Sequence, residues 1–244
     1  QVLLQEMGAC SYQFPTIAIR PLDDYSYLRE AIRRIESYKW IVFTSVNGVK
    51  YFWSQLEEMG LDARCLGHCK LAAIGPATAQ ELAGKGIKPD FVPDTYVAES
   101  VVQGLLERGV QGEKVLIPRA EKAREVLPTK LQEAGVQVEV LPVYRTVLAE
   151  ESSEQIKQAV EAGSIQIITF TSSSTVENFF QLFSPEDLAA YVPDKIKLAC
   201  IGPVTAHTLE GFGFQADIVP EEYTIPGLAK AINSFILGEF SSKH

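Results

Sequence analysis

A ten-residue stretch that occurs twice constrains the fold of this chain more than any other feature. The copies are KLAAIGPATA at 70–79 and KLACIGPVTA at 197–206; eight of ten positions are identical, and the offset is 127 residues. In each copy an apolar run typical of a buried strand meets Gly-Pro, and a helical pattern follows. Because the first N–H groups of a helix have no helical partner, each copy favours anion binding. The sequence therefore predicts two such elements, directed at one ligand.

The offset of 127 residues holds well outside the repeated stretch. Further matched pairs are 4–8 with 131–135, 43–45 with 170–172, 92–93 with 219–220, and Tyr96 with Tyr223. A constant offset over so many positions indicates duplication without internal insertion. It predicts an architecture of two similar lobes.

Comparison of the two copies also predicts that the first copy lacks its opening strand and loop in this sequence. The second copy opens with KVLIPR at 114–119, the pattern of a buried strand followed by a loop. The corresponding positions of the first copy would lie ahead of residue 1. We therefore expect an N-terminal strand and its loop to be missing from the first copy in this sequence.

Strand and helix patterns alternate along each copy. The predicted strands are 40–44, 71–74, 91–92, 115–118 and 136–141. Helical patterns lie at 28–35, 49–60, 97–107 and 126–134, with another through residue 82. This alternation predicts parallel sheets covered on both faces, with ligands at the carboxyl ends of the strands. Two β-branched segments, 16–20 and 143–147, are expected to form a two-stranded connection between the lobes.

Composition excludes several functional classes. The 244 residues are 46% hydrophobic and 22% charged, as in soluble globular proteins, and no apolar run reaches the length of a membrane span. A net charge of −9 argues against a nucleic-acid or anionic-membrane partner. Four cysteines form no disulfide framework in a chain of this length, which predicts a cytoplasmic protein.

The cysteines and histidines could also suggest a metal site. Cys65, His68 and Cys69 cluster in the sequence, but no second pair of ligands completes the set, so buried or solvated thiols are the preferred interpretation. His207 is replaced by Gln80 in the matching helix, which makes a histidine-based catalytic triad improbable. We expect no metal.

A set of short motifs, in this order and spacing, resembles the uroporphyrinogen-III synthase family over essentially the whole chain. The motifs are FTS at 43–45, IGPAT at 74–78, IPR at 117–119, LPVYRT at 141–146, FTSS at 170–173 and IGPVTA at 201–206. The family closes the linear tetrapyrrole hydroxymethylbilane with inversion of its last ring. The resemblance implies an enzyme of tetrapyrrole biosynthesis, a cyclising hydro-lyase, that needs no cofactor.

The resemblance also implies an architecture. It consists of two flavodoxin-like or Rossmann-like parallel α/β domains, internally duplicated and joined by a two-stranded connector, with the active cleft between them. One domain would comprise 1–15 plus 148–244 and the other 21–142, with connectors at 16–20 and 143–147. Duplication alone does not choose between this division and a simple split near residue 113.

The implied substrate carries eight carboxylates, which helix N-termini can bind through free N–H groups and the positive end of the helix dipole. The alternative is that the hydroxyl side chains only cap their helices. The predicted substrate-binding residues lie at these turns and in the loop at 92–96. They are Ser45, Gly75, Thr78, Tyr96, Ser172, Ser173, Gly202 and Thr205. Tyr223 matches Tyr96 in the second copy.

Tyr144 is the predicted catalytic residue, because the resemblance places a functional tyrosine in this connector. Its phenol would protonate the departing hydroxyl of the substrate; without the resemblance, a packed connector side chain is the simpler interpretation. Arg119 directly follows a buried strand and is the best candidate for a carboxylate contact. Arg145 is a further candidate, whereas solvated surface charge is the preferred interpretation of Lys122 and Arg124.

Two functions from different classes remain open at this stage. The first is the cofactor-free synthase acting on hydroxymethylbilane, expected as a monomer or fused to a tetrapyrrole methyltransferase. The second is a non-catalytic, two-lobed binding module for an anionic small molecule. The motif set favours the enzyme.

Overall fold

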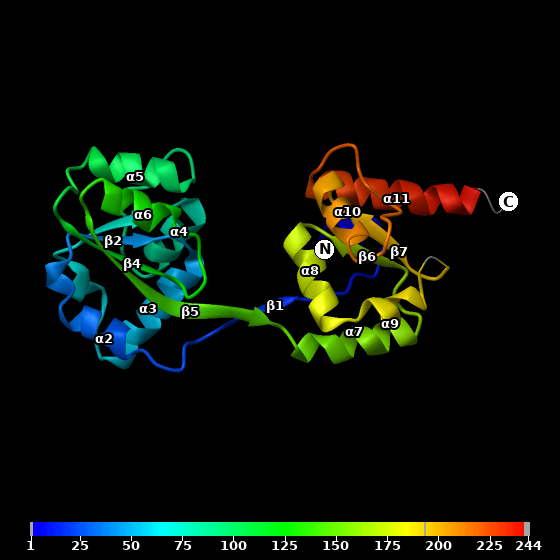
Figure 1. Cartoon of the computed structure of the whole chain (residues 1–244), viewed down its shortest axis with the longest axis horizontal. Coiled ribbons are helices and arrows are strands. Elements are labelled where there is room, and N and C mark those ends of the chain that lie inside the picture. The colour runs from blue at the N-terminus through cyan, green and yellow to red at the C-terminus, as the bar shows by residue number, and fades with distance from the viewer. Residues whose placement is uncertain (1, 193, 242–244) are drawn as a thin grey trace. The chain divides into compact units, whose positions relative to one another are not determined.

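A computed structural model describes residues 2–192 and 194–241. The chain divides into two compact units, each with parallel strands and surrounding helices (Figure 1). Unit 1 comprises Gln1–Ala18 and Val147–His244, and unit 2 comprises Ile19–Thr146. No helix among the described residues has the length and apolar character needed to cross a membrane.

The sheet of unit 2 has the strand order β1-β5-β4-β2-β3. Its strands are β1 (Ile17–Arg20), β2 (Trp40–Phe43), β3 (Lys70–Ala73), β4 (Lys114–Ala120) and β5 (Gln137–Leu148). The pairs β2–β3, β2–β4 and β4–β5 are parallel, which confirms the predicted parallel α/β class. The ends of β1 and β5 extend into unit 1.

Helices cover both faces of this sheet. They are α2 (Ser26–Arg33), α3 (Val46–Glu58), α4 (Pro76–Gly84), α5 (Ala98–Leu106) and α6 (Val126–Glu133), with 3₁₀ turns at Ile35–Ser37 and Ala63–Leu66. Alternate residues of β2 enter different cores. Ile41 and Phe43 pack with residues of α2, α3 and α4, whereas Trp40 and Val42 pack with residues of α5 and α6. This burial on two faces explains why β2 is an uninterrupted apolar run.

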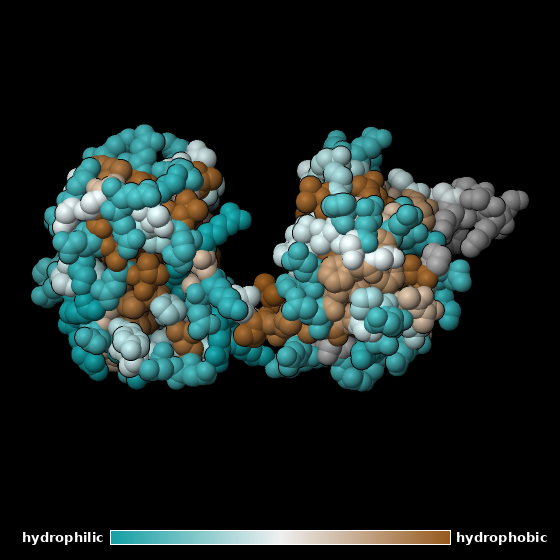
Figure 2. Space-filling view, in the orientation of Figure 1, coloured by the Kyte–Doolittle hydropathy of each residue, from teal (hydrophilic) through white to brown (hydrophobic). Residues whose placement is uncertain are grey.

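Unit 1 contains a parallel pair of strands, β6 (Ile167–Phe170) and β7 (Lys197–Cys200). Its helices are α1 (Val2–Glu6), α7 (Glu151–Glu161), α8 (Ser173–Leu182), α9 (Pro185–Ala189), α10 (Pro203–Glu210) and α11 (Ile225–Ser241). Leu198 and Cys200 face a core rich in phenylalanine, and Ala199 faces a second core that includes residues of α11. In the view of Figure 2 hydrophilic residues cover most of unit 2, whereas unit 1 shows larger hydrophobic areas among them.

Two predicted strand boundaries differ from the structure. Residues 91–92 form a single bridge, Ala72 to Phe91, because Pro93 has no N–H to extend the pairing. The segments 136–141 and 143–147 belong to one strand, β5, which passes through Pro142. Arg119 pairs with Pro142 and Ala120 with Tyr144, so a bulge places the proline inside the strand.

Candidate functional site

The candidate site of unit 2 lies where β2 and β3 end and two helices begin. Ser45 caps α3, and its Oγ accepts a hydrogen bond of 2.9 Å from the N–H of Gly48. Gly75 caps α4, with Pro76 at the first helical position. The predicted sequence of strand, tight turn and helix is therefore present at both places. Each helix start leaves N–H groups without a helical partner, an arrangement suited to an anion.

Unit 1 contains the corresponding pair of helix starts. Ser172 caps α8 and accepts a hydrogen bond of 3.2 Å from the N–H of Thr175. Gly202 caps α10. The neighbouring Ser173 accepts a bond of 2.8 Å from the hydroxyl of Thr208, so this hydroxyl joins α8 to α10. Ser173 therefore has a packing role whether or not it touches a ligand.

A tyrosine ring lies against each capping glycine. A Cβ at Gly75 would lie 3.4 Å from the ring of Tyr96, and one at Gly202 would lie 3.2 Å from the ring of Tyr223. The two tyrosines remain 58% and 61% exposed. Glycine thus permits close contact between ring and backbone, while the rest of each ring faces solvent beside a helix N-terminus.

Thr78 and Thr205 occupy the first turns of α4 and α10 and are each only 4% exposed. Their hydroxyls are placed for local packing more than for broad contact with a large ligand. A ligand at these helix starts would meet mainly backbone N–H groups and the tyrosine rings.

Tyr144 lies on β5 and is 8% exposed. Its Oη is 3.2 Å from Oγ of Ser45, so the structure brings the predicted catalytic residue to a predicted binding residue. The ring of Tyr51 stacks on Tyr144 with centroids 5.7 Å apart. Tyr25 donates a bond of 2.9 Å to the carbonyl of Val143, which fixes the backbone beside Tyr144.

Tyr51 and Tyr25 were missed by the sequence reasoning. Tyr51 is on α3, but the helical stripe used to predict that helix runs through Val49, Phe52 and neighbouring apolar positions. Tyr51 could have been found from its spacing, because it follows Ser45 by six residues and so lies less than two turns along the same helix. Burial raises the pKa of Tyr25, which keeps it a hydrogen-bond donor.

Two of the candidate arginines, Arg119 and Arg145, have carboxylate partners inside unit 2. Arg119 is 7% exposed and donates to the carbonyl of Arg124, 2.9 Å away, and to the carboxylate of Glu125. Arg145 forms a two-bond pair with Asp23, at 2.7 and 2.8 Å, which raises the pKa of the guanidinium. Each guanidinium therefore already has an anionic partner within its own unit.

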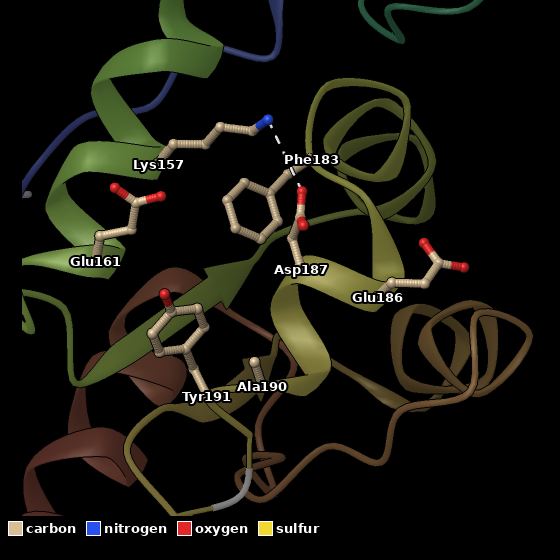
Figure 3. Close-up of a pocket in the computed structure, with 7 residues that line it drawn as sticks. All are labelled: Lys157, Glu161, Phe183, Glu186, Asp187, Ala190 and Tyr191. Atoms are coloured by element: carbon tan, nitrogen blue, oxygen red, sulfur yellow. Dashed lines mark ion pairs between the residues drawn. The ribbon is translucent and has the colours of Figure 1, made fainter.

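Two pockets lie away from these residues. One of about 240 Å³ in unit 1 lies among α7, α8 and α9, where Lys157 and Asp187 form an ion pair of 3.8 Å (Figure 3). The other, of about 640 Å³, is an open hollow beside Ile35 and Cys65 in unit 2. Neither is lined by a predicted site residue.

Within the described residues no group of three or more metal-binding side chains is present. The thiol of Cys69 donates to the carbonyls of Ile35 and Tyr38, each 3.3 Å away. Burial raises the pKa of Cys69 to about 11. A thiol held protonated in this way is a poor metal ligand, because metals bind the thiolate.

Comparison with known proteins identifies the family. The family model described as uroporphyrinogen-III synthase HemD matches residues 1–230. The chain is 33% identical to a putative uroporphyrinogen-III synthase of Methanothermobacter thermautotrophicus, over 94% of this chain and 90% of that protein. It is 32% identical to the porphyrin biosynthesis protein HemD of Ruminiclostridium josui over 92% of this chain, but it spans only 44% of that protein.

A solved structure shares the fold. A mutant uroporphyrinogen III synthase of Thermus thermophilus is 20% identical, and the match covers 98% of this chain and 93% of that one with a TM-score of 0.55. At this identity the match speaks for the fold alone. The family match and the Methanothermobacter relative together establish that the chain belongs to the uroporphyrinogen-III synthase family.

Proposed function

We propose that this chain closes hydroxymethylbilane into uroporphyrinogen III, with inversion of the last ring, as a cofactor-free hydro-lyase. Family membership supports the reaction. The observation that carries the chemistry is the contact of 3.2 Å between Tyr144 and Ser45 at the start of α3. It combines a proton donor with a helix N-terminus suited to carboxylates.

The reaction begins with loss of the terminal hydroxyl of the substrate. The carbon–oxygen bond breaks, the oxygen takes a proton and leaves as water, and the pyrrole nitrogen stabilises the remaining azafulvene cation. In the proposal the phenol of Tyr144 donates a hydrogen bond to the departing hydroxyl. A positioned donor of this kind lowers the barrier of the dehydration step.

The hydrogen bonds around Ser45 suit this role. The N–H of Gly48 donates to Oγ of Ser45, so the serine hydroxyl can donate its own proton to Oη of Tyr144. The phenolic proton is then available to the substrate. Because each donor in such a chain polarises the next, the phenol becomes a stronger donor than an isolated one.

Substrate carboxylates would be bound by the helix starts at Ser45, Gly75, Ser172 and Gly202. This use of backbone N–H groups explains how a chain with a net charge of −9 can accept a polyanion. Arg119 would act indirectly, because its bond to Glu125 holds the loop that follows β4.

Replacing Tyr144 tests the proposal. The purified chain should consume hydroxymethylbilane faster than its spontaneous rate, and Tyr144→Phe should lower kcat by about 10- to 100-fold, at or below the low end for general acids. The effect should be modest because the cation is already stabilised and water can replace the donor. KM should change little, since the interaction is made in the transition state.

Tyr51→Phe is the matched control. Its ring stacks on Tyr144, but its hydroxyl donates to the carbonyl of Ile19, 3.5 Å away. We expect nearly normal kcat for this variant. Equal kcat in both variants and the parent chain would remove Tyr144 from the mechanism. A chain that binds hydroxymethylbilane without accelerating its loss would favour the binding module. The monomeric state, the methyltransferase fusion and the cytoplasmic location stay predictions.

A further inference from the structure

Tyr144 lies at an irregular point of β5. Arg119 of β4 pairs with Pro142, but the next residue of β4 pairs with Tyr144, so the register shifts between them. Pro142 has no N–H to donate to the ladder, and a bulge interrupts strand pairing locally. Beyond the bulge the carbonyl of Tyr144 accepts a bond of 2.8 Å from the N–H of Glu121. The pairing with β4 is therefore irregular at the residue proposed to do the chemistry.

The loop between β1 and α2, residues 21–25, contacts β5 on both sides of Tyr144. Tyr25 donates a hydrogen bond of 2.9 Å to the carbonyl of Val143, the residue before Tyr144. Asp23 accepts two hydrogen bonds, of 2.7 and 2.8 Å, from the guanidinium of Arg145, the residue after it. The loop is therefore joined to β5 immediately before and immediately after Tyr144.

Both contacts fix orientation. The hydroxyl of Tyr25 also accepts a bond of 3.2 Å from the N–H of Leu22, so it connects two backbone segments. Arg145 uses two N–H groups on the two carboxylate oxygens of Asp23, a geometry that sets the planes of both groups. The side chain of Asp23 is 82% exposed, and an ion pair so exposed contributes little to the free energy of unfolding. We therefore expect the pair to affect the placement of β5 more than the stability of the fold.

The phenol of Tyr144 depends on this placement, because its other contacts come from a different element. Ser45 caps α3 and lies 3.2 Å from Oη of Tyr144, and Tyr51 of α3 stacks on the ring. A shift of β5 relative to α3 would lengthen the contact with Ser45 and loosen the stack.

We propose that Asp23 and Tyr25 are positioning residues, which hold the phenol of Tyr144 in place for the dehydration step. Arg145 then serves as the partner of Asp23 and does not bind a substrate carboxylate. The inference rests on the proposed function. The two roles of Arg145 give different expectations for Asp23→Asn. A positioning role lowers kcat, whereas a substrate-binding Arg145, freed from Asp23, would lower KM.

Steady-state kinetics with hydroxymethylbilane test the inference. Asp23→Asn and Tyr25→Phe should each lower kcat by about three- to tenfold, because a misplacement of about 1 Å costs about 100-fold and a smaller shift costs less. KM should change by less than about twofold, since the loop does not touch substrate. Unchanged kcat in both variants, or a lower KM for Asp23→Asn, would overturn the inference.

Asp24→Asn is the matched control for Asp23→Asn. The carboxylate of Asp24 accepts bonds of 2.7 and 2.8 Å from the N–H and hydroxyl of Ser26, within its own turn. Asparagine forms such a turn as well as aspartate does. The control should keep the kcat of the parent chain. A fall in the control equal to that of Asp23→Asn would count against the inference, because loss of charge alone would then explain both.

A double-variant cycle separates positioning from a general effect on the fold. In the Tyr144→Phe background, Asp23→Asn and Tyr25→Phe should leave kcat within about twofold of Tyr144→Phe alone, because the group that they place is gone. The same fold decrease in both backgrounds would show that the loop does not act through Tyr144, and the inference would fail.

The ring signals of Tyr144 report its placement without substrate. In a chain with ¹³C-labelled tyrosine, they are the signals that disappear in Tyr144→Phe, and the stacked ring of Tyr51 influences their shifts. They should move in Asp23→Asn and Tyr25→Phe but not in Asp24→Asn; signals that stay in place in the first two variants refute the positioning role. If the parent chain does not accelerate the loss of hydroxymethylbilane, the proposed function fails, whereas these signals still decide whether the loop places Tyr144.

Discussion

Two glycines hold the starts of α4 and α10 close to tyrosine rings, and at Gly202 a Cβ would require the neighbouring ring to shift by a few tenths of an ångström. The backbone at Gly75 and Gly202 is extended, with φ of −164° and −174°, so an alanine there would not strain the backbone. The constraint is the space that the ring of Tyr96 or Tyr223 occupies. These exposed rings are thereby fixed beside the helix N-termini.

Gly202→Ala tests this arrangement. Its Cβ would lie 3.2 Å from Tyr223, against 3.4 Å for the matched variant Gly75→Ala and Tyr96, so Gly202→Ala should displace its ring more. Alanine is also a poorer cap than glycine, and each variant should lose about 0.5 to 1 kcal/mol of unfolding free energy in urea. We expect the larger fall in kcat/KM for Gly202→Ala. Unchanged kcat/KM in both would show that the rings do not position substrate.

The capping positions could be predicted from the sequence because their chemistry is local. Ser45 and Gly202 each follow a strand and precede a helix within a few residues. The pairing of Arg119 with Glu125 could not be predicted, because it depends on a loop that folds back on itself. The contact of Tyr144 with Ser45 joins residues 99 apart and depends on the order of strands in the sheet.

At the scale of elements, Glu139 ties β5 to its neighbours. Its carboxylate accepts hydrogen bonds from Arg34, at 2.7 and 3.1 Å, and from Tyr38, at 2.8 Å, and it pairs with Lys114 of β4 at 3.0 Å. Burial and the bond to Glu139 raise the pKa of Tyr38. The cluster thus fixes the 3₁₀ turn at 35–37 against the sheet.

This cluster predicts a pH dependence of stability. Burial raises the pKa of Glu139, but the bonds from Arg34, Lys114 and Tyr38 outweigh burial and leave the pKa below its usual range. A carboxyl whose pKa is lower in the folded state stabilises the fold above its unfolded pKa, about 4.3. That stabilisation is lost as the pH falls through the folded pKa.

Glu139→Gln should therefore cost about 1 to 3 kcal/mol of unfolding free energy at pH 7, as expected for bonds to a charged group. The difference from the parent chain should shrink as the pH falls from about 5 toward 2. Urea unfolding at a series of pH values measures it. A difference that stays constant over this range would show that the charge of Glu139 is not what stabilises the fold.

Most elements could be predicted because periodicity and turn residues agree along the chain. β2 and α3, for example, lie close to the predicted 40–44 and 49–60. The exceptions depend on tertiary contacts, which cannot be inferred from the periodicity of the sequence. Residues 91–92 form one bridge because Pro93 follows, and β5 passes through Pro142 because a bulge against β4 accommodates it. Glu139 was part of a predicted strand, but its three partners come from other elements.

At the scale of the whole molecule, each unit offers the same two helix starts, consistent with the 127-residue repeat in the sequence. In unit 2 they follow β2 and β3, and in unit 1 they follow β6 and β7. The offset predicted this correspondence before the structure. It does not predict the chemistry, because identical caps occur in α/β proteins of many functions. The family match supplies what the repeat lacks, and the catalytic role of Tyr144 is the proposal that the contact with Ser45 supports.

The isomer composition of the product tests the central claim most directly. Hydroxymethylbilane that closes without an enzyme gives uroporphyrinogen I, because its last ring is not inverted. The purified chain is mixed with hydroxymethylbilane, and the porphyrinogens are oxidised and separated by isomer. We expect isomer III to predominate and its share to rise with protein concentration. Isomer I alone, formed at the rate seen without protein, would contradict the proposed synthase activity.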